Sequence, residues 1–159
     1  MHQHTENARV IARRMCRRLG IPTYHCDRLV YVHDLPERIG GDPSIIMTKF
    51  LKDRGLHKKF HKYMLDELIK NIFPPGTRME LRLYLEKLFR ELLQCKTLEA
   101  MLAEDADTLE LGIESMRLVG QGYSRVREIV DRINNDGNIF LTSVGQRIWQ
   151  EQKKKMDWQ

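Results

Sequence analysis

The sequence predicts a mainly α-helical protein. Three observations support this class: several stretches place apolar residues three or four positions apart, helix-capping residues precede many of them, and strand-like stretches are few. We expect seven to eight helices, a short strand near residues 28–33 and a hairpin-like element near residues 134–142. The chain has 159 residues, of which 42% are hydrophobic, about the size and composition of one domain with its own core. A single helical domain over residues 1–159 is therefore expected.

The first predicted helix covers residues 7–19 and separates apolar from basic side chains. At about 100° per residue, its apolar side chains fall on one arc. The opposite arc carries five arginines: Arg9, Arg13, Arg14, Arg17 and Arg18. Gly20 and Pro22 follow as stop signals, so the helix should end near Leu19.

The next stretch changes character twice. Residues 23–35 are rich in β-branched and aromatic side chains, which favours a strand over residues 28–33. Asp42 and Pro43 are typical of a helix start, and Gly55 closes that helix. A further helix is expected over residues 56–73, ended by the sequence PPG.

Capping boxes mark the later helices. Thr77 and Glu80 open a helix that should run to about residue 94, and Ser143 opens a last helix that ends in three lysines. Between them we expect shorter helices over residues 97–103, 107–118 and 124–134, the second boxed by Glu110. The sequence NNDG then predicts a turn before the extended segment NIFLT.

Charge is concentrated in the first part of the chain. Residues 1–62 contain 13 Lys or Arg and 6 Asp or Glu, a net charge of +7, whereas the whole chain has +5. Clusters of basic side chains can bind phosphate oxygens without reading base sequence, and the alternative is a solvated helix face. The predicted contact residues are the five arginines named above together with Lys49, Lys52, Lys58, Lys59 and Lys62.

The C-terminal third, residues 95–159, is similar to generic winged-helix domains in the order of its elements. A helix reading SRVREIVDRINNDG precedes the extended segment, as a recognition helix precedes a wing. On a helical wheel Arg125 and Arg132 lie together, opposite the apolar residues, where they could face a major groove. The resemblance implies a subdivision into a basic helical part, residues 1–94, and a winged-helix-like part. A structural hairpin is the alternative.

All six histidines lie within the first 61 residues. His57 and His61 are one helical turn apart on the predicted apolar arc, so we expect them to be buried. Zinc could be held by His25, His33, Cys16 and Cys26, whose donor types suit it, but their spacings match no compact zinc motif. We therefore predict no metal, no cofactor and free cysteines.

Motifs for catalysis are missing. The sequence contains no P-loop, dinucleotide fingerprint, nucleophile elbow or H-E-x-x-H. We therefore expect no catalytic residue, and a non-enzymatic regulatory or assembly protein that binds RNA or DNA. The alternative is a helical interaction module, whose acidic stretch, residues 99–114, would dock onto a basic face.

Partners and location follow from the same patterns. The predicted partner is nucleic acid or an acidic protein surface, and a homo-oligomer is a further option. No apolar run approaches the roughly 18 residues of a membrane span, and the first residues lack the apolar core of a signal peptide. An intracellular protein, cytoplasmic or nuclear, is expected.

Overall fold

The computed structural model describes residues 2–35, 47, 50–51, 53–72 and 79–158. These residues form seven α-helices and one short 3₁₀-helix, and no strand occurs among them, so the mainly α prediction is confirmed. In chain order the elements are α1 (His2–Leu19), α2 (Thr23–His33), α5 (His57–Ile72), α6 (Met79–Gln94), α7 (Leu98–Gly120), η1 (Ser124–Val126), α8 (Arg127–Asn135) and α9 (Ser143–Lys155).

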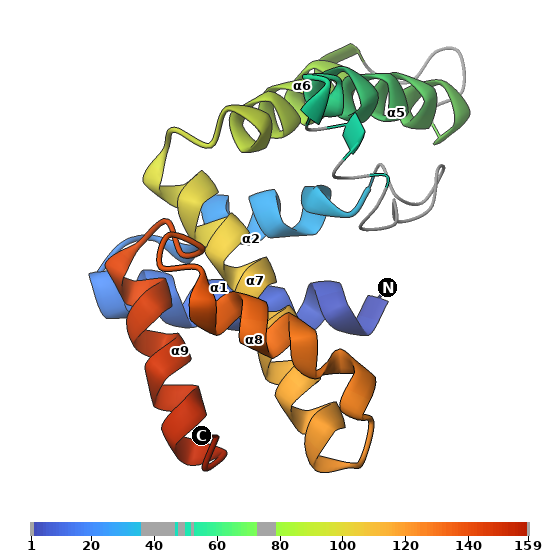
Figure 1. Cartoon of the computed structure of the whole chain (residues 1–159). Helices are drawn as coiled ribbons and strands as arrows, with labels where there is room; N and C mark the ends of the chain where they lie inside the picture. Colours follow the sequence, from blue (N-terminus) through green and yellow to red (C-terminus); the bar gives the residue numbers. More distant parts are fainter. Residues whose placement is uncertain (1, 36–46, 48–49, 52, 73–78, 159) are drawn as a thin grey trace.

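Helix α7 is the centre of the arrangement. It contacts α1, α2, α6, α8, α9 and η1, and in Figure 1 it runs obliquely from beside α2 downwards, crossing α1 and α8. The core around it contains Met15, Leu29, Leu102, Leu109 and Trp149, which are almost wholly buried. Helices α5 and α6 run side by side at one end of the molecule, where α6 contacts α2.

The predicted strand over residues 28–33 is wrong, because this segment belongs to α2. Cys26, Leu29 and Val30 are buried, a spacing of three and four positions that puts them on one helical face. The β-branched and aromatic residues suggested a strand, but packing against α1 and α7 overrides such a preference.

Residues 98–120 form one helix instead of the two shorter ones expected. Thr97 caps it, because its side chain accepts a hydrogen bond from the Ala100 backbone N–H at 3.2 Å. Asp107, where a second helix was expected to start, lies inside the continuous helix. The pair Asp107 and Glu110, which predicted a helix start, must therefore have another role.

The predicted hairpin near residues 134–142 is a turn without strands. Asp105 of α7 holds it: the carboxylate accepts hydrogen bonds from the backbone N–H groups of Leu141 (2.7 Å) and Thr142 (2.9 Å) and from the Thr142 hydroxyl. Thr142, not Ser143, caps α9 by accepting a hydrogen bond from the Gly145 N–H at 3.1 Å. The loop is tied to the helix beneath it, so it is not a wing.

Some predictions lie outside the described residues. The helix expected to start at Asp42 is largely among them, as is the capping residue Thr77. The side chains of His57 and His61 are likewise not described, so their predicted burial stays a prediction, as does the division into domains. Among the helices described, none is long and apolar enough to cross a membrane.

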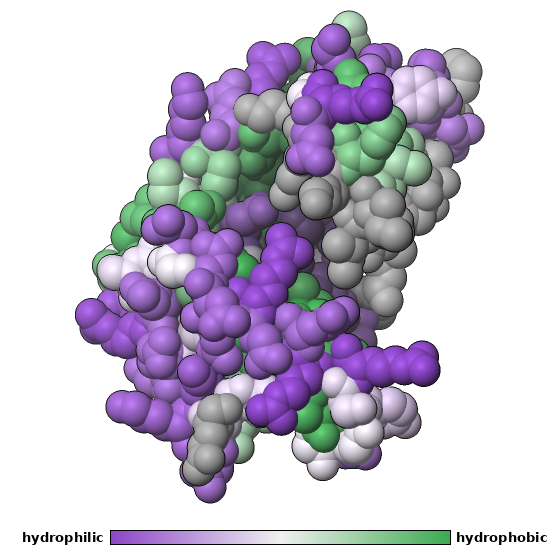
Figure 2. Space-filling model, viewed as in Figure 1, coloured by the Kyte–Doolittle hydropathy of each residue, from purple (hydrophilic) through white to green (hydrophobic). Residues whose placement is uncertain are grey.

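The face of the molecule in Figure 2 is covered mainly by hydrophilic side chains. Apolar side chains gather in its upper half, over α5 and α6. In these two helices Tyr63, Met79 and Leu83 are more than half exposed.

Candidate metal centre

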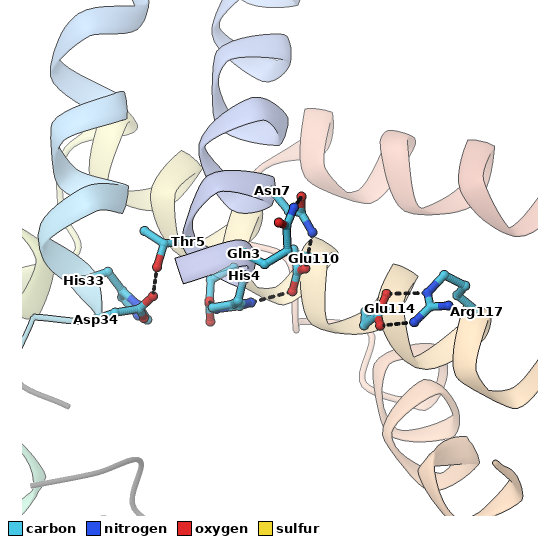
Figure 3. A network of polar contacts seen from close by, with 10 residues as sticks. Gln3, His4, Thr5, Asn7, His33, Asp34, Glu110, Glu114 and Arg117 are labelled. Carbon is cyan, nitrogen blue, oxygen red and sulfur yellow. Dashed lines mark hydrogen bonds and ion pairs between the residues drawn. The ribbon is translucent and has the colours of Figure 1, made fainter. Parts of the chain in front are cut away.

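Three side chains from distant parts of the sequence meet beside α7. His4 comes from the first turn of α1, Asp34 directly follows α2, and Asp107 lies within α7. One ligand atom from each lies within 4.8 Å of the other two. His33 adjoins them, and Figure 3 shows His4, His33 and Asp34 converging where these helices meet.

Helix packing places these groups, and hydrogen bonds orient them. His4 Nε2 lies 2.8 Å from Asp107 Oδ1. The Thr5 hydroxyl donates to Asp34 Oδ2 at 2.5 Å, and His33 Nδ1 lies 3.0 Å from Asp34 Oδ1. Because Asp34 is buried and each of its oxygens has a partner, its position is fixed by both neighbouring helices.

The carboxylates of the site favour positive charge on the neighbouring histidines. Contacts with Asp107 and Glu110 raise the pKa of His4 to about 10. Burial would lower the pKa of His33, but the bond to Asp34 and nearby carboxylates raise it to about 9. Burial would likewise raise the pKa of Asp34, yet His33 and Thr5 keep it below its ordinary value. Protons on the two imidazoles thus balance the carboxylates.

The donor set fits a divalent metal. Imidazole nitrogen and carboxylate oxygen are ligands for zinc, iron and manganese, which bind them at about 2.0–2.2 Å. Ligands around one such ion lie within roughly 4.4 Å of each other. The ligand atoms of His4, Asp34 and Asp107 lie within 4.8 Å of one another, so these three residues fit one such ion, with His33 as a further candidate.

Fold and site together define a class: a helical protein in which histidines and aspartates from separate helices form a candidate metal centre. Comparison with protein families matches residues 4–149 to the HD domain, so the chain belongs to the HD domain family. No curated protein and no solved structure matches it. The family match spans all four residues of the site.

The family match overturns the functional prediction. The HD domain is a metal-dependent hydrolase domain, so the prediction of a non-enzymatic nucleic-acid-binding regulatory protein is wrong. The structure also gives a role to the N-terminal arginines other than binding nucleic acid. They largely pair with the protein's own carboxylates, so the sequence pattern indicated internal ion pairs as much as a free basic surface.

Two acidic residues take up most of that arginine face. Arg9 and Arg13 both bind Asp27 of α2, at 2.7 and 2.6 Å. Arg18 binds Glu151 of α9 at 2.7 Å, and Arg14 lies 3.8 Å from the same carboxylate. These pairs join α1 to α2 and to α9.

The other predicted contact residues are scattered. Arg17 is exposed on α1, Arg125 on η1 and Arg132 on α8. Lys59 and Lys62 are exposed on α5, whereas Lys49, Lys52 and the side chain of Lys58 lie outside the described residues. The predicted partners, nucleic acid or an acidic protein, remain predictions.

Sequence reasoning missed His4, Asp34 and Asp107, and considered His33 only beside cysteines. Cys16 and Cys26 are instead buried in the core, and Asp107 and Glu110 were interpreted as a helix cap. The available signal was the adjacent pair His33–Asp34, with an isolated histidine before it and an aspartate far after it. Such spacing suggests a site only when the helices are known to meet.

Proposed function

We propose that the protein is a metal-dependent phosphohydrolase, which cleaves a phosphate ester at the centre formed by His4, His33, Asp34 and Asp107. The meeting of His4, Asp34 and Asp107 from three elements is the observation that carries the proposal. Family membership supports the same reaction class, since HD domains are typically metal-dependent phosphohydrolases.

A bound divalent ion would supply positive charge for the phosphate oxygens and would lower the pKa of a bound water. The chain's own residues would hold the ion, and their hydrogen bonds orient the side chains that face it. Asp34 is fixed by Thr5 and His33, and Asp107 and His4 face each other from α7 and α1. Loading the ion releases protons from the imidazoles, so metal affinity should rise with pH.

The test begins with protein stripped of metal by a chelator. It is then reloaded separately with Mn²⁺, Co²⁺, Zn²⁺ or Mg²⁺ and assayed for phosphate release from p-nitrophenyl phosphate and from nucleoside monophosphates. Metal-dependent hydrolysis that EDTA abolishes is the expected result. Tight metal binding without hydrolysis of any phosphate ester would overturn the reaction but leave the metal centre, and failure to bind any of the ions would overturn both.

We also infer an intracellular location. The three cysteines Cys16, Cys26 and Cys95 are free thiols, which suits a reducing compartment. Fractionation of cells that express the tagged protein at its natural level tests this inference.

A further inference from the structure

Glu110 is a buried carboxylate whose two oxygens both face α1. It lies on α7 three residues after Asp107, and only 7% of its surface is exposed. Its Oε2 is 2.5 Å from His4 Nδ1, and its Oε1 accepts a hydrogen bond from the Asn7 side-chain amide at 3.0 Å. Figure 3 shows Glu110 between Asn7 and His4.

The two ring nitrogens of His4 have different partners. Nε2 faces Asp107 at the metal centre, whereas Nδ1 faces Glu110. A nitrogen that binds a metal needs a free lone pair, so in the neutral ring the other nitrogen must carry the proton. An ionised Glu110 only accepts hydrogen bonds, and it therefore favours the ring with its proton on Nδ1.

We propose that Glu110 is a positioning residue that fixes the tautomer and orientation of His4 for metal binding, and that Asn7 holds Glu110 in place. This inference rests on the proposed metal-dependent function. Carboxylates that bind the second nitrogen of a metal-binding histidine typically affect metal affinity by about 10–100-fold. The position of Glu110 is therefore explained by its contact with His4 across the interface between α7 and α1, and not by the predicted role in a helix cap.

A structural ion pair on the same helix provides the control. Glu114 lies one turn further along α7 and pairs with Arg117 at 2.6 Å, with its side chain 42% exposed. Glu114→Gln therefore makes the same chemical change as Glu110→Gln away from His4. Asp27→Asn removes a link between α1 and α2 and controls for loosened packing of α1.

The experiment measures the dissociation constant of Mn²⁺ by titration calorimetry for wild type, Glu110→Ala, Glu110→Gln and the two controls. Glu110→Ala should weaken Mn²⁺ binding by about 10–100-fold, Glu110→Gln less, and both controls by under about twofold. Nitrogen-15 spectra of the Zn²⁺-loaded protein should show the His4 proton on Nδ1 in wild type and a mixed or altered state in Glu110→Ala.

Three outcomes would overturn the proposal, and they can be told apart. If wild type binds Mn²⁺ and both Glu110 variants bind it equally well, Glu110 only joins α1 to α7. If wild type binds no metal, the proposed function fails and this inference with it. Should Glu110→Ala not fold, the near-isosteric Glu110→Gln and the wild-type His4 tautomer still decide, because a proton on Nε2 of the Zn²⁺-loaded protein contradicts the proposal.

Discussion

Asp105 and Asp107 lie two positions apart on α7 but face different surroundings. Asp105 is fully buried, and its contacts are with N–H and O–H donors of one loop. Asp107 is 30% exposed in its side chain and faces His4, with Asp34 close by. Residues two apart on a helix point in opposite directions, so one helix builds both sites.

The comparison separates a structural carboxylate from a binding one. Burial raises the pKa of Asp105, although the hydrogen bonds from Thr142 and Leu141 act in the opposite direction. Its neighbours satisfy it completely without a ligand. At Asp107 a second carboxylate, that of Asp34, and ionisable imidazoles lie close together. A proton on His4 now balances negative charge that a bound metal ion would balance instead.

The largest expected effect is on the binding carboxylate. Asp107→Asn removes a charge and a ligand, so metal-dependent phosphate release should fall about 1000-fold, equivalent to roughly 4 kcal/mol of transition-state stabilisation. The free energy of unfolding of the metal-free protein should fall by only about 1–2 kcal/mol, because the lost bond between Asp107 and His4 is partly exposed. Steady-state kinetics and urea denaturation measure the two. A large stability loss with normal activity would reverse the assignment.

Asp105→Ala should give the opposite pattern. It leaves two backbone N–H groups and the Thr142 hydroxyl without their acceptor, which should cost about 3 kcal/mol of unfolding free energy. Its Mn²⁺ affinity, measured below the unfolding transition, should stay within about twofold of wild type. Asp105→Asn keeps one acceptor oxygen and should lose less stability. Weakened metal binding at full stability would contradict the distinction.

Local sequence patterns correctly predicted several helix ends. The arginine face and the Gly20 and Pro22 stop signals identified the end of α1. The helix expected from residue 97 begins where α7 begins, directly after its capping residue Thr97. Helix α2 was missed because Val30, Tyr31 and Val32 favour strands when taken alone, whereas burial against α1 and α7 decides their conformation.

The site could not be assembled from the sequence because its members are far apart. His4 and Asp107 are separated by 103 positions, and only the packing of α1 on α7 brings them together. The same limit applies to charge: the five arginines were correctly placed on α1, but their carboxylate partners on α2 and α9 are known only from the fold.

Gly145 offers a milder way to disturb the structural carboxylate. A Cβ atom at this position would lie 2.4 Å from Asp105 Oδ2, which is too close for any contact. Gly145→Ala should therefore cost about 2 kcal/mol of unfolding free energy, despite alanine's better helix propensity. Gly137→Ala, where the Cβ would meet no atom within 4 Å, is the control and should change stability by under about 0.5 kcal/mol. Thermal and urea denaturation of both variants compare them. Equal stability of the two variants would show that the Asp105 site can relax.

The smallest expected effect concerns Asp27, a carboxylate held by side chains instead of a loop or a metal. Burial would raise the pKa of Asp27, but hydrogen bonds from Arg9 and Arg13 keep it below its ordinary value of 3.8. A lowered folded-state pKa means that the ionised form stabilises the protein above pH 3.8, and that this contribution is lost as the pH falls through the folded-state value. Asp27→Asn should therefore cost about 1 kcal/mol of unfolding free energy at pH 7 and progressively less below pH 3.8.

Urea denaturation of wild type and Asp27→Asn at pH 7, 4 and 3 measures this difference. Glu114→Gln removes a more exposed ion pair and should cost less at pH 7. A cost for Asp27→Asn that does not change with pH would mean that packing of the side chain, and not its charge, joins α1 to α2. Mn²⁺ affinity should be unchanged at pH 7, because Asp27 bonds to Arg9 and Arg13 and not to the metal centre. A carboxylate paired with arginines would then be distinguishable from both aspartates of α7: it stabilises the fold only while ionised, and it binds no metal.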